Sequence, residues 1–329
     1  MVGRTNAQEE GLKIAVVICT LQRPRSLQRT LASLAQCDPP RRAEWSVVVV
    51  DNSGCAETQD TVASFRDRLP ITLLVEPTAG LAQARNAAVA ATACDYFIWT
   101  DDDVTVSVGW IRDYEAAFER NPDVAFFGGP IAPRFEGDPP AWIAACLPDI
   151  YTAFAGRDGF ADAATFDRTS RQLPFGANLA VRASEQYRFR YDVTLGRQPG
   201  QRLLSGEESD CMQRICRAGG TGLWVASACV DHWIDATRQS VAYLWRYYRG
   251  MSFGLWRARL LSRGKRPKES KRKMRWQLVR SNALYLWGRV TGKPHIWIKA
   301  LKRSADLSGQ LAARREFRLH RFQASGSGE

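Results

Sequence analysis

The sequence predicts an α/β fold in which helices cover both faces of a doubly wound, mostly parallel sheet. Short apolar runs alternate with helical segments about four or five times over roughly the first 130 residues. These runs lack the polar–apolar alternation of half-exposed strands, as expected for a parallel sheet that is buried on both sides. Polar residues follow several of the runs directly. Ligands of such sheets bind beyond the carboxyl ends of the strands.

The first elements follow from apolar runs and the turns that close them. A β-branched run at Ile14–Cys19 predicts the first strand, and Pro24 suits the first turn of the helix after it. Val47–Val50 predicts a second buried strand, closed by the turn residues of Asp51–Gly54. We then expect a helix at about 56–68, a strand at 71–75 and an Ala-rich helix at 81–92.

The chain is organised around the apolar run Tyr96–Thr100, which is followed by Asp101, Asp102 and Asp103. The run predicts a buried strand. Like charges this close raise each other's pKa, so a cation must usually offset them. Oxygen ligands of this kind suit Mg²⁺ or Mn²⁺, whose shell a nucleotide diphosphate can complete. The alternative interpretation is a solvated acidic turn that caps the next helix.

Polar residues at three strand ends are expected to share one rim of the sheet. Thr20, Asp51 and Asp101 each come where a predicted strand ends, although they lie far apart in the sequence. Carboxyl ends of parallel strands meet at one edge. This convergence predicts a ligand site from the residues alone.

The middle of the chain is less regular. Residues 131–172 contain several Pro and Gly and predict a binding loop or lid. A strand is expected at 174–181, and the acidic cluster 206–210 is expected to open a helix that Gly219–Gly220 closes. A short strand at 223–225 precedes His232.

Composition favours a cytoplasmic protein that is not integral to a membrane. The N-terminal residues carry charges where a signal segment would be apolar, and no run approaches the ~18 apolar residues of a membrane span. The eight cysteines form no CxxC pair, which favours reduced packing thiols.

The net charge is unevenly distributed. Residues 240–329 carry 22 Lys and Arg against 4 Asp and Glu, whereas the rest of the chain is slightly acidic. We expect helices from about 239, a basic link at 264–273, and helices at 274–290 and 294–322. Basic helices rich in Trp are typical of membrane-surface elements, here the inner face of an anionic membrane. Nucleic-acid binding is a weaker alternative without a reader motif; packing on the body and self-association are the others.

Seven motifs, in order over roughly residues 13–235, resemble inverting glycosyltransferases of family 2. They are Val17–Pro24, Val49–Ser53, Gly80–Asn86, Trp99–Asp103, Gly176–Ala180, Leu204–Asp210 and Asp231–His232. The resemblance implies a GT-A fold at 13–237, after an N-terminal tail at 1–12. It does not extend to the basic helical extension, 238–322, or the flexible end, 323–329.

The resemblance implies a role for each matched position. Thr20, Arg23, Asp51 and Asn52 should line the nucleotide pocket, with Asp51 accepting from the imide N–H of uracil or thymine. Arg85 should lie near the base or the phosphates, and Asn178, with Gly176, beside the donor sugar. Asp103 should bind Mn²⁺ or Mg²⁺, Asp101 or Asp102 should help, and one of these two should reach the ribose. His232 is a third metal ligand or a phosphate contact by this reading, and a packed residue otherwise.

Inversion requires a base that takes the proton from the acceptor hydroxyl. The resemblance places Glu208 in this role, Glu207 beside it as an orienting group, and Asp210 as the rival base, because the family more often has Asp at the position of Glu208. Without the resemblance, these residues are an acidic first helical turn stabilised by the helix dipole.

The expected reaction is metal-dependent transfer from a nucleotide-sugar donor, UDP-sugars first, to a hydroxyl on a glycan or lipid-linked acceptor. Synthesis of cell-surface or extracellular polysaccharide, or of glycolipid, is the expected setting, with an oligomer as an open option. The alternatives are a sugar nucleotidyltransferase and a catalytically inactive binding or scaffold protein. The first alternative should show a Gly- and Arg-rich phosphate loop after the first strand, where this chain has Thr20–Pro24.

Overall fold

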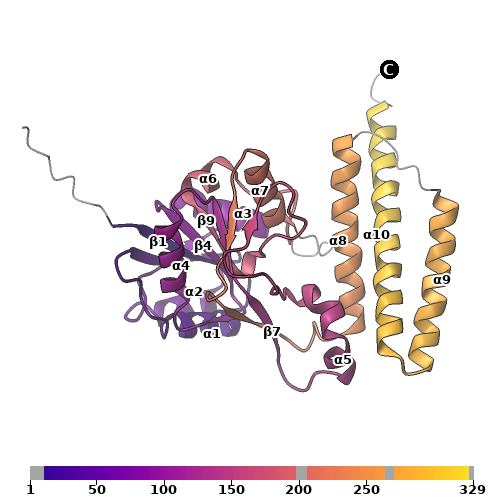
Figure 1. The fold of residues 1–329 in the computed structure, drawn as a ribbon, viewed down its shortest axis with the longest axis horizontal. Coiled ribbons are helices and arrows are strands. Elements are labelled where there is room, and N and C mark those ends of the chain that lie inside the picture. Colours follow the sequence, from indigo (N-terminus) through magenta and orange to yellow (C-terminus); the bar gives the residue numbers. More distant parts are fainter. Residues whose placement is uncertain (1–10, 198–205, 264–269, 326–329) are drawn as a thin grey trace, which may run out of the picture.

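A computed structural model describes residues 11–197, 206–263 and 270–325 (Figure 1). An eight-stranded sheet forms the centre of the body, in the order β3-β2-β1-β4-β9-β6-β10-β8. The strands β1 (Lys13–Thr20), β2 (Glu44–Asp51), β3 (Ile71–Val75) and β4 (Tyr96–Asp101) are parallel. β9 (Leu179–Arg182) runs antiparallel between β4 and β6 (Phe126–Gly128). β10 (Gly222–Trp224) and β8 (Thr165–Phe166) complete the edge.

Helices cover both faces of this sheet, as the sequence predicts. Successive residues of β1 point to opposite sides, so Val16 and Val17 belong to different cores. One core includes residues of α1 (Pro24–Leu34), α2 (Ala56–Ala63) and α4 (Trp110–Arg120). The other includes residues of α3 (Leu81–Ala91), α6 (Ala183–Arg188) and α7 (Glu207–Arg217). The mixed, mostly parallel α/β fold is therefore confirmed.

The register of the parallel strands brings the three expected strand ends to one rim. Thr20 pairs with Asp51 in neighbouring strands, and Cys19 pairs with Asp101 on the other side of β1. The predicted convergence is therefore confirmed by strand pairing.

A three-stranded sheet lies beside the first and corrects two sequence-based expectations. It contains β5 (Val104–Val106), β7 (Ile131–Phe135) and β11 (Val230–Ile234). His232 lies within β11 rather than after a strand. The segment 131–172 is also more regular than expected, because it contains β7, helix α5 (Ala141–Ile150) and the 3₁₀ turn η1 (Tyr151–Phe154). The prolines favour loops, but the burial of apolar side chains stabilises regular structure there. Ile143, Cys146 and Ile150 pack α5 into a third core.

Three long helices form the C-terminal part: α8 (Val241–Arg263), α9 (Lys271–Val290) and α10 (Pro294–Ser325). α10 packs between the other two, and α9 lies farthest from the sheet (Figure 1). α8 and α10 join α5 and η1 in the third core, through Leu244, Trp297 and Phe154. Within the described residues, no helix combines the length and apolar character that a membrane crossing requires.

Some expected features lie outside the described residues. These are the first ten residues of the N-terminal tail, Leu204 and Ser205 of the acidic motif, 264–269 of the basic link, and 326–329 of the flexible end.

Candidate active site

A cavity of about 480 Å³ opens at the carboxyl ends of β1 and β4. Strand ends, the start of α7 and the C-terminal part of the chain all contribute to its wall. The polar residues that line it and that the sequence had singled out are Thr20, Arg23, Asn52, Arg85, Asp101, Asp102, Asp103, Glu207 and Glu208. The acidic triplet and the acidic helix start therefore share one cavity.

Asp102 is a buried carboxylate that accepts hydrogen bonds from residues at and just after the end of β1. Thr20 Oγ1 donates to its Oδ2 at 2.7 Å, and Arg23 Nη1 donates to its Oδ1 at 2.6 Å. Burial raises the pKa of Asp102 to about 7, although the Arg23 charge opposes this shift. Both carboxylate oxygens of Asp102 are thus engaged within the protein.

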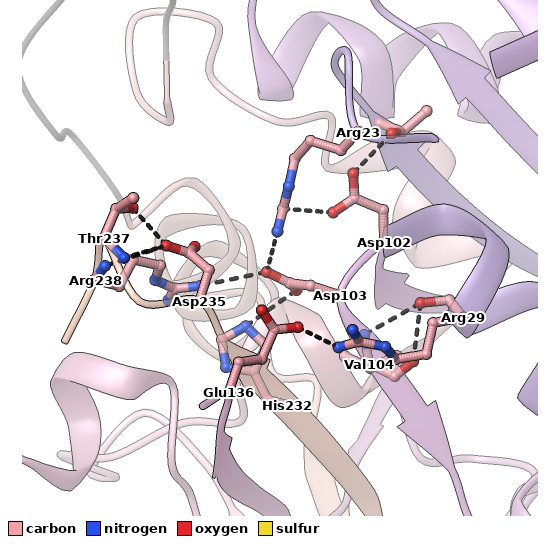
Figure 2. A network of polar contacts seen from close by, with 12 residues as sticks. Arg23, Arg29, Asp102, Asp103, Val104, Glu136, His232, Asp235, Thr237 and Arg238 are labelled. Carbon is pink, nitrogen blue, oxygen red and sulfur yellow. Dashed lines mark hydrogen bonds and ion pairs between the residues drawn. The ribbon is translucent and has the colours of Figure 1, made fainter. Parts of the chain in front are cut away.

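Asp103 lies at the centre of a network of cations (Figure 2). Arg23 Nη2 donates to Asp103 Oδ2 at 2.8 Å, and Arg238 Nη1 donates to the same oxygen at 3.2 Å. Burial alone would raise the pKa of Asp103, but His232 and the two arginines hold it well below its usual range. The Asp103 carboxylate is therefore kept ionised.

The orientation of His232 fits a metal ligand. Its Nδ1 lies 2.9 Å from the carbonyl oxygen of Phe154, which can only accept, so Nδ1 carries the proton. Nε2 then faces Asp103 Oδ1 at 3.1 Å, and that oxygen has no hydrogen-bond partner among the described residues. Two acceptors this close require a cation between them or a proton on Nε2.

One donor atom each from Asp101, Asp103 and His232 lies within 4.8 Å of the other two. Carboxylate oxygens with one imidazole nitrogen suit Mn²⁺ well and Mg²⁺ acceptably. Hydrogen bonding of the other His nitrogen to a carbonyl is the usual way that proteins fix such a ligand. The residues present therefore fit the expected divalent cation.

Arg85 connects the acidic triplet to the acidic helix start. Its Nη1 donates to Glu207 Oε1 at 2.9 Å, and its Nη2 lies 4.0 Å from Asp101 Oδ1. The Trp99 and Tyr191 rings flank the guanidinium. Burial would lower the pKa of Arg85, but Glu207, together with the other nearby acidic groups, raises it instead.

Gly176 makes room for this arginine. A Cβ on Gly176 would lie 2.4 Å from Arg85 Nη2. Gly176, which the resemblance places beside the donor sugar, thus lies against a side chain of the protein itself.

Glu207 and Glu208 open α7 after Gly206, whose φ of +114° favours glycine. Burial raises the pKa of Glu207 to about 7; Glu208 adds to the shift and Arg85 opposes it. Glu208 also lines the cavity, with its Oε2 3.7 Å from Arg85 Nη1. The Oε2 atoms of both residues have no hydrogen-bond partner among the described residues.

Asp210, the rival base, does not line the cavity. Its Oδ2 accepts from Arg214 Nε at 2.8 Å, one helical turn along α7. At 3.6 residues per turn, the Asp210 side chain points about 160° away from that of Glu208 around the helix axis.

Asp51 and Asn52 shape the loops beside the cavity. The buried Asp51 carboxylate accepts from the Ser53 and Cys55 amides and from the Ser53 hydroxyl, and it does not line the cavity. Asn52 does line it, while its side chain binds the backbone of Glu76, Thr78 and Gly80. The carboxylate expected to bind a base is thus occupied by its own turn.

Asn178 does not take the place expected for it beside a ligand. It lies in the 3₁₀ turn Gly176–Asn178, fully buried, and does not line the cavity. Its Oδ1 accepts from Trp110 Nε1 and Tyr114 Oη, and its Nδ2 donates to the carbonyls of Pro130 and Ala228. All hydrogen-bonding capacity of the amide is thus used within the protein.

The C-terminal wall of the cavity was not predicted from the sequence. Arg238, Tyr247 and Met251 line it, as does Thr152 of η1. The expected boundary between residues 237 and 238 therefore falls within the site. Arg238 is presented by a turn in which Asp235 accepts from the backbone of Thr237 and Arg238, and no motif marked it.

Comparisons with known proteins agree with this geometry. Residues 15–160 match the family model described as Glycosyl transferase family 2. The succinoglycan biosynthesis protein ExoM of Rhizobium meliloti (strain 1021) is 29% identical over 243 residues, which cover 71% of each chain.

Two solved structures show the same fold. The mannosyltransferase PcManGT from Pyrobaculum calidifontis, in complex with GDP-Man and Mn²⁺, has a TM-score of 0.55 at 16% identity, covering 97% of this chain and 80% of that one. S. aureus TarS 1–349 in complex with UDP has a TM-score of 0.51 at 13% identity, covering 93% and 92%. The arrangement of the body is thus that of GT-A transferases.

Proposed function

We propose that this chain, which is a family 2 glycosyltransferase, moves a sugar from a nucleotide diphosphate to an acceptor hydroxyl, with inversion at the anomeric carbon. One observation carries the proposal: a single cavity holds the Asp101–Asp103 cluster and the Glu207–Glu208 pair, bridged by Arg85. The first cluster suits a cation and a diphosphate. The second suits removal of a proton.

The donor would lie with its diphosphate near Asp101 and Asp103. Asp101, Asp103 and His232 would hold Mn²⁺ or Mg²⁺, which when bound supplies positive charge for the leaving diphosphate. Arg23 and Arg238 both pair with Asp103 and add positive charge there. Thr20 and Asn52 line the cavity and would contact the nucleotide.

UDP-sugars remain the first donors to test, although Asp51, on which the preference for uracil rests, is engaged by its own turn. TarS was solved with UDP and PcManGT with GDP-Man. A donor panel should therefore contain both bases.

Glu208 would act as the base. It takes the proton from the acceptor hydroxyl while that oxygen bonds to the anomeric carbon, and the bond to the diphosphate oxygen breaks. Glu207 and Arg85 would position it, since Arg85 Nη1 lies within 4 Å of both glutamates. The engagement of Asp210 with Arg214 favours Glu208 over Asp210.

The acceptor would enter along the wall made by η1 and α8, which brings Thr152, Tyr247 and Met251 to the cavity. Aromatic rings such as that of Tyr247 commonly pack on the apolar faces of sugars. The name of the relative ExoM supports polysaccharide biosynthesis as the setting. A glycan or lipid-linked glycan is the proposed acceptor class, at the inner face of the membrane.

The test is release of nucleoside diphosphate from a panel of UDP- and GDP-sugars, with Mn²⁺ and with the metal chelated. We expect slow donor hydrolysis that requires the metal and increases with a suitable glycan. Turnover of a nucleoside triphosphate with a sugar 1-phosphate would instead identify a nucleotidyltransferase. Donor binding without turnover of any substrate would indicate an inactive binding protein.

A further inference from the structure

Helix α9 presents an apolar face to solvent. Its buried side, which carries Met274, Ser281 and Gly288, faces α10. Gly288 is needed for this close packing, because a Cβ there would lie 2.9 Å from the backbone nitrogen of Trp297. The large apolar side chains on the rest of α9 remain outside: Trp276, Val279, Leu284, Leu286, Trp287 and Val290, with exposed fractions between 42% and 87%.

Most of these exposed side chains form one stripe. Counted from Trp276 as position i, the stripe continues at i+3, i+10, i+11 and i+14 with Val279, Leu286, Trp287 and Val290. The small Ala283 occupies position i+7. At 3.6 residues per turn, these positions fall within about 100° of the helix circumference. The buried residues occupy the opposite side. A contiguous apolar row of this length on a surface indicates a partner.

Cations border the stripe, and no acidic residue interrupts it. Residues 271–290 contain six Lys and Arg and no Asp or Glu. Arg275 and Arg280 are exposed along its edges, and the exposed Arg272 lies about one turn before Trp276. Arg280 lies over the Trp276 ring at 5.8 Å, and Lys293 lies over the Trp287 ring at 5.2 Å. Both tryptophans of the row thus have a cation at the ring face.

We propose that this face of α9 lies in the headgroup region of an anionic lipid bilayer and attaches the protein to the membrane surface. Apolar side chains would enter the acyl boundary, the tryptophans would lie at the interface, and the arginines would meet lipid phosphates. In this arrangement the helix lies flat on the surface.

The charge distribution favours the bilayer over other partners. Two copies of this chain meeting through α9 would bring their cationic borders together. A nucleic acid would satisfy the arginines but leave Leu286 and Val290 exposed to water. An anionic membrane satisfies both the apolar row and the cations.

The position of α9 is compatible with catalysis. α9 is the outermost helix, and α10 separates it from α8, the helix that supplies Tyr247 and Met251 to the cavity (Figure 1). The stripe faces away from α10 and therefore away from the cavity. This attachment does not depend on the proposed reaction.

Co-sedimentation of the full chain with vesicles tests the proposal. One set of vesicles contains phosphatidylcholine alone, and the other contains equal parts of phosphatidylcholine and phosphatidylglycerol. We expect binding to the second set at low salt and a loss of about tenfold or more in Trp276→Gln/Trp287→Gln, because less apolar area enters the lipid. The control is Val75→Gln/Val108→Gln, which alters two exposed apolar residues outside the C-terminal helices and should bind like the parent.

Two results would overturn the proposal. One is no binding of the parent to anionic vesicles at low salt; the other is equal binding by the tryptophan variant. Mass measurement by light scattering adds a third: a dimer that the tryptophan variant abolishes, without vesicle binding, assigns the face to a second copy. Donor hydrolysis in the absence of vesicles should be equal in all variants, which separates this result from failure of the proposed function.

Discussion

Arg85 and Glu207 form a buried ion pair in which Nη1 donates to Oε1 at 2.9 Å. The same guanidinium lies 4.0 Å from Asp101 at the end of β4. One side chain thus sets the spacing between the cluster suited to a cation and the proposed catalytic base.

Replacing Arg85 by Ala should destabilise the protein. Glu207 would lose its buried partner, and removing one member of a buried ion pair costs about 3–5 kcal/mol of unfolding free energy. Urea denaturation measures this loss. Arg112→Ala is the control, since it breaks a surface pair with Asp38 and should cost no more than about 1 kcal/mol. Equal costs in both variants would contradict a structural role for the Arg85 pair.

A methyl group at position 176 should displace Arg85 without removing any functional group. In Gly176→Ala the new Cβ would lie 2.4 Å from Arg85 Nη2, so the guanidinium must move. We expect kcat to fall by roughly tenfold or more, because misplacement of positioning groups by an ångström is costly. Gly109→Ala adds a Cβ at an ordinary 3.5 Å contact and should be neutral. An unchanged kcat in Gly176→Ala would be the contrary result.

The raised pKa of Glu207 predicts a specific pH dependence of stability. Its folded-state pKa of about 7 lies above the ordinary 4.5, so its contribution to stability is complete below pH 4.5. That contribution is lost as the pH rises through 7. The stability of the parent relative to Glu207→Gln should therefore fall between pH 5 and 8, by about 2–3 kcal/mol. Urea titrations across this range measure it; a pH-independent difference would argue against the shift.

His232→Ala should weaken Mn²⁺ binding, since the ring presents Nε2 while Phe154 holds Nδ1–H. We expect Mn²⁺ affinity to fall about 10–100-fold, measured as free Mn²⁺ by electron paramagnetic resonance. His295→Ala is the matched control, because that imidazole is exposed on α10 near Asp149. Equal affinities in the two variants would remove His232 from the proposed metal site.

Asn178→Ala should affect stability rather than donor binding. It would leave the buried Trp110 Nε1–H and the Tyr114 hydroxyl without the acceptor they share. We expect a loss of about 2–4 kcal/mol of unfolding free energy, with the KM for the donor unchanged. A raised KM in a variant that remains folded would return Asn178 to the donor site.

The sequence was informative where function follows from the position of strand ends. The run Tyr96–Thr100 predicts a buried strand, and parallel strands bring Thr20 and Asp101 to one rim whatever lies between them. The start of α7 is equally local, because its acidic first turn and Gly206 define it.

The hydrogen-bond partners of individual side chains could not be predicted in the same way. Nothing local to Asn178 shows that it bonds Trp110, Tyr114 and two backbone carbonyls far along the chain. Arg238 reaches Asp103 only because β11 and the Asp235 turn deliver it there. The prolines of 131–172 indicated loops, whereas burial of Ile143 and Ile150 against α8 and α10 residues stabilises α5.

The most direct test of the account is sugar transfer by Glu208→Gln at saturating donor, with nucleotide affinity measured in parallel. Loss of the base should lower the rate by about 10²–10⁴-fold, while affinity for the nucleotide diphosphate with Mn²⁺ stays within about twofold of the parent. Asp210→Asn should retain transfer, because Asp210 is bound to Arg214 and does not line the cavity. Transfer that survives in Glu208→Gln and is lost in Asp210→Asn would contradict the assignment of the base.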